Sequence, residues 1–186
     1  MHLGNNYMFS KNNIQKLLKT NKKKRIKELA DNLDNILFLD FDGVINLDEN
    51  NYSGLFNNSE LINNLSSFCL IYNFKIVVIS SWRKYSNYKD ILYNSGLDRK
   101  VEIIGATDNL EKDRESEVIK YLKEHCYINK FIILDDRPFD KLKKYQIQTK
   151  YEEGFNNEKY DEAIELINKD LWWYNKGVIE WVLQMN

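Results

Sequence analysis

Three short clusters of polar side chains each follow an apolar run directly. The polar residues are Asp40 and Asp42 in the first cluster, Ser80, Ser81 and Arg83 in the second, and Asp135 and Asp136 in the third. Carboxylates beside buried apolar residues are costly unless a cation or a hydrogen-bond donor compensates them. Oxygen ligands alone select a hard cation, and Mg²⁺ leaves coordination positions for water and a phosphate. Mg²⁺ beside a carboxylate nucleophile is typical of phosphoryl transfer through an aspartyl-phosphate.

The apolar runs before the clusters predict buried strands of a parallel sheet. Alternating strands and helices indicate an α/β fold with a doubly wound parallel sheet. Because the carboxyl ends of parallel strands meet at one edge, we expect the clusters to lie together where the strand order switches. The expected strands are residues 36–39, 76–79, 101–104, 131–134 and an edge strand at 145–148, and the expected helices are residues 60–72, 88–94, 111–126 and 160–169.

A plainer explanation of the same residues is a set of aspartates that form turns and helix caps at strand ends. Any one of the three clusters fits that explanation. Three clusters in this order, each after an apolar run, fit it poorly, because several carboxylates would then share one edge of the sheet without a cation. We therefore prefer a single shared site.

The ordered clusters resemble the motifs of the haloacid dehalogenase (HAD) superfamily of phosphohydrolases. Residues 40–44, with the sequence Asp-Phe-Asp-Gly-Val, match its first motif, Ser80 matches the second, and Asp135-Asp136 match the fourth. The resemblance covers roughly residues 35–168. A narrower likeness, to the HAD domains associated with RNA-repair proteins, is carried by residues 79–83, 114–122, 134–138 and 148–154.

The resemblance implies a role for each carboxylate. Asp40 would be the nucleophile and a metal ligand. Asp42 would act as general acid and then as general base, and its backbone carbonyl would bind the metal. Asp136 would ligate Mg²⁺ directly, with Asp135 supporting it or bound through water.

The phosphate-binding residues follow from the same resemblance. Ser80, with Ser81 beside it, would hydrogen-bond the transferring phosphoryl group. The third motif is a Lys or Arg near the start of the helix before the fourth strand; Arg114 fits it better than Lys112, and both remain candidates. Arg83 is either a second phosphate contact or a bridge to a core carboxylate.

Many HAD enzymes carry a cap domain that closes over small substrates, and this sequence has no room for a full one. Residues 44–75 and 84–109, where a cap would be inserted, amount to 32 and 26 residues. We therefore expect an open catalytic mouth, which suits a phosphorylated RNA or DNA end or a nucleotide. The alternatives are a small-metabolite or phosphoprotein phosphatase with the same chemistry, and a non-catalytic binding module of the same fold.

The expected organisation is a basic helical extension at residues 1–34, a catalytic domain at 35–170 and an aromatic C-terminal helix at 171–186 that packs on the core. With a formal net charge of −1, the whole protein is not a polycation, so nucleic-acid affinity needs a local patch such as this extension.

No apolar run is long enough for a bilayer span, and no secretory signal is readable. We therefore expect a cytoplasmic protein. The oligomeric state stays open.

Overall fold

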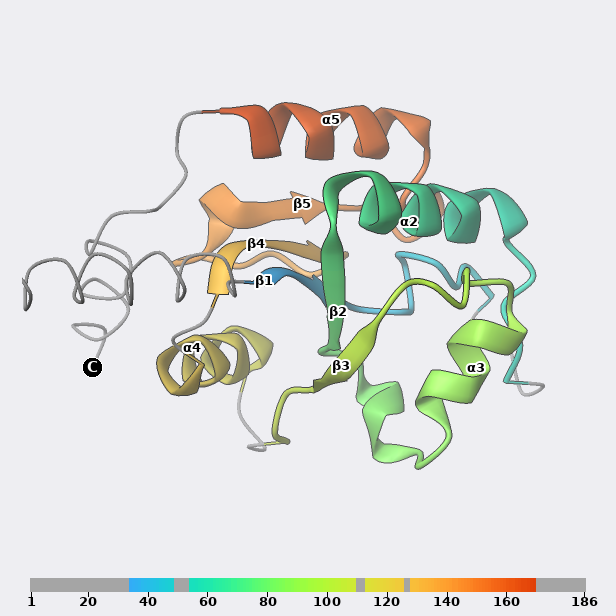
Figure 1. The fold of residues 1–186 in the computed structure, drawn as a ribbon, viewed down its shortest axis with the longest axis horizontal. Helices are drawn as coiled ribbons and strands as arrows, with labels where there is room; N and C mark the ends of the chain where they lie inside the picture. The colour runs from blue at the N-terminus through green and yellow to red at the C-terminus, as the bar shows by residue number, and fades with distance from the viewer. Residues whose placement is uncertain (1–33, 49–53, 110–112, 126–127, 170–186) are drawn as a thin grey trace, which may run out of the picture. The chain divides into compact units, whose positions relative to one another are not determined.

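Five parallel strands form the centre of the structure (Figure 1). The computed structural model describes residues 34–48, 54–109, 113–125 and 128–169. The strands lie side by side in the order β3-β2-β1-β4-β5. Their bounds are β1 (Asp34–Leu39), β2 (Phe74–Val78), β3 (Ile103–Ala106), β4 (Ile128–Asp135) and β5 (Gln146–Gln148).

The strand order switches direction between β1 and β4. From β1 the chain moves outward through β2 to β3, then returns to place β4 on the other side of β1. The expected doubly wound α/β fold is therefore confirmed. Ligands of such sheets bind beyond the carboxyl ends of the strands at this switch, which is where the first and third polar clusters lie.

Helices cover both faces of the sheet (Figure 1). The two faces are fixed by the alternation of side chains along β1: Leu37 and Leu39 pack in one apolar cluster, and Ile36 and Phe38 pack in the other. The described helical elements are α2 (Ser59–Tyr72), η1 (Ser81–Lys84), α3 (Tyr88–Asn94), α4 (Arg114–Glu124), η2 (Lys143–Tyr145) and, after the last strand, α5 (Asn157–Asn168).

The periodicity of α2 explains why it covers the sheet. Its buried apolar side chains recur at intervals of three and four residues, which is the spacing of one helical face. They belong to the cluster that contains Leu37 and Leu39, together with residues of α5. On the opposite face, Val118 and Ile119 of α4 pack beside Ile36 and Phe38. The buried apolar residues of α2 are Leu61, Ile62, Leu65, Phe68 and Cys69.

The third strand lies two residues later than expected. The prediction was residues 101–104, and β3 is Ile103–Ala106. Val101 is buried, but its N–H bonds to the carbonyl of Asp98 in a turn rather than to a neighbouring strand. Its apolar side chain therefore reflects core packing and not strand pairing.

No full cap domain is found in the part of the chain that the structure describes. Between β1 and β2 that part holds one helix, α2, and between β2 and β3 it holds η1 and α3. No described helix is long and apolar enough to cross a membrane.

The predicted basic extension ends one residue earlier than expected, because Asp34 belongs to β1. Three earlier predictions lie outside the described residues: the rest of that extension, the C-terminal aromatic helix and the role of Lys112. They stay predictions.

Candidate active site

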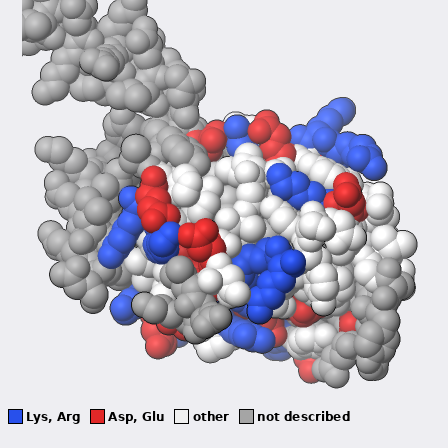
Figure 2. All heavy atoms as spheres, turned by 90° about the horizontal axis from the view of Figure 1, so that it is seen from below, with Lys and Arg blue, Asp and Glu red and all other residues white. Residues whose placement is uncertain are grey.

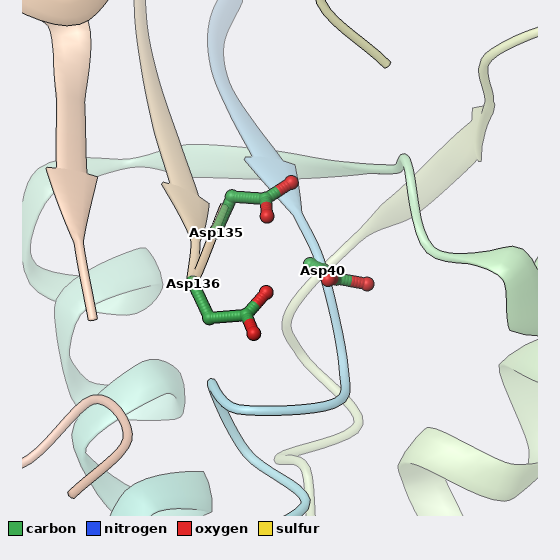
Figure 3. Close-up of side chains that lie close together, drawn as sticks. All are labelled: Asp40, Asp135 and Asp136. Carbon is green, nitrogen blue, oxygen red and sulfur yellow. The ribbon is translucent and has the colours of Figure 1, made fainter. Parts of the chain in front are cut away.

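Three aspartates converge at the switch between β1 and β4 (Figure 3). Asp40 follows β1 directly, Asp135 is the last residue of β4, and Asp136 comes next. Asp40 and Asp135 are buried, and Asp136 is half-buried. One carboxylate oxygen from each residue lies within 4.8 Å of the others. The sequence-based expectation that the first and third clusters meet is therefore confirmed.

Gly43 is what allows the first loop to pass so close to Asp136. Its φ is +71°, a conformation that side chains with a Cβ rarely adopt. A Cβ on this residue would lie 2.8 Å from the Cβ of Asp136. The buried Thr149 hydroxyl donates a hydrogen bond of 2.7 Å to the Gly43 carbonyl and fixes the loop against the chain after β5.

Arg114 supplies the positive charge of the site. Its guanidinium forms ion pairs with Asp40 and, at 2.7 Å, with Asp135. Arg114 is the first residue of α4, and the helix begins there because the Asp113 carboxylate accepts a hydrogen bond of 2.8 Å from the Ser116 N–H. The helix cap thus directs Arg114 toward the carboxyl ends of β1 and β4.

Burial dominates the electrostatics of these carboxyls. Burial and then repulsion from Asp40 raise the pKa of Asp135 from 3.8 to about 7, and Arg114 acts in the opposite direction. Burial also raises the pKa of Asp40, while Arg114 and then Ser80 oppose it. Burial alone would lower the pKa of Arg114, but Asp40 and Asp135 outweigh it and raise that pKa. The site therefore holds an ionised guanidinium and carboxyls that resist ionisation unless more positive charge is present.

The residues present fit a hard divalent cation. The Oδ1 atom of Asp40 is buried and has no hydrogen-bond partner among the described residues. A buried polar atom without a partner costs free energy, so such an atom in a native site calls for a ligand. Asp135 and Asp136 direct further carboxylate oxygens to the same place. An all-oxygen donor set of this kind matches Mg²⁺ or Ca²⁺ better than Zn²⁺.

Asp42 has different partners from Asp40. The Trp82 indole Nε1 donates to both carboxylate oxygens of Asp42, at 2.9 and 3.1 Å. The Asn46 amide donates to Oδ1 at 2.7 Å. Sequence analysis missed both donors. Trp82 stands inside the second polar cluster, but a pattern of residues cannot show that it reaches a side chain 40 positions away.

The two serines of the second cluster differ in exposure. Ser80 is fully buried, its oxygen accepts a hydrogen bond from the Trp82 N–H at 3.4 Å, and it lies near enough to Asp40 to act on its pKa. Ser81 is exposed and begins η1. Of the two, Ser80 is the one placed beside the carboxylates.

Arg83 lies in the core and bridges a buried carboxylate, which is the second of its two expected roles. Its Nη2 atom lies 2.6 Å from Oε2 of Glu117, and the two side chains are 8% and 3% exposed. Its Nη1 atom donates to the carbonyls of Ile79 and Ser80. The pair joins the loop that carries Ser80 to the helix that carries Arg114. Glu117 was not expected as a partner, because polarity at a helix position does not reveal a contact 34 residues away.

Comparison with known proteins adds one match. A protein-family model described as the HAD domain in Swiss Army Knife RNA repair proteins matches residues 36–160. No curated protein and no solved structure matches the chain. The matched span contains all three polar clusters and Arg114, so it includes every residue described above at the candidate site.

Gly43→Ala is expected to destabilise the protein more than Gly54→Ala. Both glycines have a positive φ, of +71° and +73°, but a Cβ at Gly54 would meet nothing within 4 Å. Gly54→Ala therefore reports the backbone strain alone, on the order of 1 kcal/mol, and Gly43→Ala adds displacement of Asp136. Urea unfolding of the two variants measures the difference. Equal losses would show that Gly43 is needed only for its conformation.

Arg83→Met is expected to lower the free energy of unfolding by about 3–5 kcal/mol, because it leaves the buried Glu117 carboxylate without its guanidinium partner. Replacing both partners by Met should cost less than the single change, since no uncompensated charge remains. Urea unfolding of the single and double variants tests this. Lys150→Met, which breaks the exposed pair with Glu153, is the control and should change little. Additive losses in the double variant would contradict the coupling.

Proposed function

The chain belongs to the family of HAD domains found in Swiss Army Knife RNA repair proteins, and we propose that it is a Mg²⁺-dependent phosphohydrolase that acts through an aspartyl-phosphate on a phosphorylated nucleic-acid end or nucleotide. The observation that supports the proposal most directly is the buried Asp40 carboxylate. One of its oxygens is paired with Arg114 and the other has no partner among the described residues. Asp42 follows two residues later, held by donors of its own.

The proposed reaction has two displacements at phosphorus. In the first, an oxygen of Asp40 bonds to phosphorus while the ester bond breaks, and Asp42 gives its proton to the leaving oxygen. In the second, Asp42 takes a proton from water, the water oxygen bonds to phosphorus, and the bond to Asp40 breaks. Arg114 and Ser80 lie beside Asp40, where a guanidinium and a hydroxyl stabilise the negative charge of the transferring group.

The proposed metal ligands are the carboxylates of Asp40, Asp135 and Asp136 and the backbone carbonyl of Asp42. Among the described residues, the three aspartate carboxylates share one guanidinium, that of Arg114, which pairs with Asp40 and Asp135. Bound Mg²⁺ would supply the missing positive charge and polarise a phosphoryl oxygen. Further hydrogen bonds hold two of these residues in place. The Asp135 carboxylate accepts one of 2.9 Å from the Arg137 N–H, and the Asp136 backbone carbonyl accepts one of 3.0 Å from the Gln148 side-chain amide.

The proposed substrate class rests on the lack of a full cap among the described residues and on the family description. The described residues between β1 and β2 and between β2 and β3 provide no cap that could enclose a small molecule. A site without a cap can accept the end of a polymer. The description of the matching family model names RNA repair proteins. Small metabolites and phosphoproteins remain the alternative substrates. A cytoplasmic location is part of the proposal and agrees with the buried thiol of Cys69, which forms no disulfide with a described residue.

Asp40→Asn is expected to abolish phosphate release from p-nitrophenyl phosphate while the protein stays folded. The amide is nearly isosteric with the carboxylate but cannot form the aspartyl-phosphate. Phosphate release is measured with a colorimetric assay and folding by circular dichroism. Asp161→Asn, at an exposed position of α5, is the matched control and should retain activity. Full activity of the Asp40 variant would rule out the proposed nucleophile.

Mg²⁺ is expected to raise the melting temperature more at pH 7.5 than at pH 5.5. The pKa of Asp135 is raised from 3.8 to about 7, so its protonated form favours folding and this stabilisation is lost as pH rises toward 7. A cation binds the ionised form and stabilises the folded state by mass action. At pH 5.5 it must first displace a proton, so its effect is smaller.

Thermal melts with EDTA or Mg²⁺ at the two pH values measure this effect, and EDTA should also abolish turnover. The variant Asp135→Asn/Asp136→Asn is the control, because it removes two of the three carboxylates. A Mg²⁺-induced shift that persists in this variant would place the metal elsewhere. Turnover in chelator-treated protein would contradict the proposed Mg²⁺ dependence.

A further inference from the structure

Four aromatic rings connect the core beside the candidate site to the surface. Phe41 contacts Phe56, Phe56 contacts Trp82, and Trp82 contacts Tyr85, with ring centroids 5.5, 5.3 and 5.8 Å apart. Exposure rises along this series. Phe41 is fully buried, Phe56 is 3% exposed, Trp82 is half-buried and Tyr85 is 60% exposed. Tyr85 is therefore the outer end of a packed aromatic series and not an isolated surface side chain.

Trp82 places Tyr85 next to the catalytic groups. The indole of Trp82 donates to the Asp42 carboxylate with its Nε1 atom and contacts the Tyr85 ring. Only one indole therefore separates Tyr85 from Asp42. In the proposed reaction Asp42 protonates the leaving oxygen, so the leaving group must lie on the Asp42 side of the phosphorus. For a phosphorylated nucleic-acid end, that leaving group is the terminal nucleoside.

The backbone around Tyr85 provides a rigid support. The Tyr85 N–H donates to the Trp82 carbonyl at 3.0 Å, and the Tyr85 carbonyl accepts from the Tyr88 N–H at 3.3 Å. Two residues earlier, the Arg83–Glu117 ion pair fixes the same segment to α4. Because the backbone is already fixed, stacking a flat partner on the ring orders only the Tyr85 side chain and costs little further freedom.

Positive charge accompanies the exposed ring. Lys84 is exposed, and no ion pair joins it to another described residue. On the face of the protein that bears α3 and α4, Lys and Arg side chains gather in a patch near the middle of the view (Figure 2). An exposed aromatic ring beside a cation is the combination that binds unpaired bases and their backbone phosphates.

We propose that Tyr85 is the stacking platform for the base of the terminal nucleotide, whose phosphate Asp40 attacks, and that Lys84 contacts the phosphate of the adjoining nucleotide. This inference rests on the proposed function and adds a base subsite to it. Stacking uses the π face that every base has, so the subsite accepts all bases but requires the end to be unpaired. The recognised substrate is then a single-stranded phosphorylated end.

The test compares Tyr85→Ala, Tyr85→Phe and the parent on three substrates: a phosphorylated single-stranded oligonucleotide, the same oligonucleotide with an abasic terminal nucleotide, and acetyl phosphate, which has no ring. Tyr85→Ala should raise KM for the first substrate roughly tenfold, because stacking on an aromatic ring contributes that order of affinity per base. Tyr85→Phe should retain the parent KM. Turnover of the abasic oligonucleotide and of acetyl phosphate should be equal in all three proteins.

Two controls separate the subsite from general effects. Ile71→Ala removes another exposed apolar side chain, on α2, and should leave every KM unchanged. Lys84→Gln should reduce the slope of log affinity against log salt for the oligonucleotide by about one unit, since one phosphate contact is lost. An unchanged slope would remove Lys84 from the subsite.

The outcomes distinguish this inference from the function on which it rests. If the parent hydrolyses neither the oligonucleotide nor acetyl phosphate, the phosphohydrolase itself is wrong, and the inference is lost with it. If the parent hydrolyses acetyl phosphate but no oligonucleotide, the substrate class is wrong. If it hydrolyses both and Tyr85→Ala has the parent KM for the oligonucleotide, the phosphohydrolase stands and the base subsite is overturned.

Discussion

Asp40 and Asp135 place two buried carboxylates within ion-pair distance of a single guanidinium, that of Arg114. Charges so far from water are tolerated only when their partners are held in fixed positions. Helix α4 meets this requirement with its first turn. Arg114 reaches the two carboxylates, and Glu117, one turn later, holds Arg83 in the loop after β2. One helix terminus therefore fixes both the charge balance of the site and the loop that carries Ser80.

The same charge balance connects stability to the proposed chemistry. Among the described residues, three carboxylates and one guanidinium leave an excess of negative charge at the end of β1 and β4. Burial, and then repulsion from Asp40, raise the pKa of Asp135, so without a cation a proton can neutralise its charge. In the proposed enzyme Mg²⁺ replaces that proton. Gly43 permits the arrangement, since only a residue without a Cβ lets the first loop pass beside Asp136.

The sequence was sufficient to predict the sheet and the convergence of Asp40, Asp135 and Asp136, because apolar runs identify buried strands and parallel strands share one carboxyl edge. It was insufficient where a contact joins distant elements. Nothing local to Arg83 indicates that Glu117 neutralises it, and nothing local to Asp42 indicates that Trp82 binds it. β3 was misplaced for a related reason, since Val101 is apolar through packing and not through pairing.

These distant contacts also bear on how an uncapped site would recognise its substrate. A cap domain holds the leaving group from above, and the described residues provide none. In the proposed scheme the loop after β2 takes over that task. Its Trp82 orients Asp42 on one side and supports Tyr85 on the other, so the proton donor and the base subsite depend on the same indole. The Arg83–Glu117 pair, which makes no contact with substrate in this scheme, is then what keeps recognition aligned with chemistry.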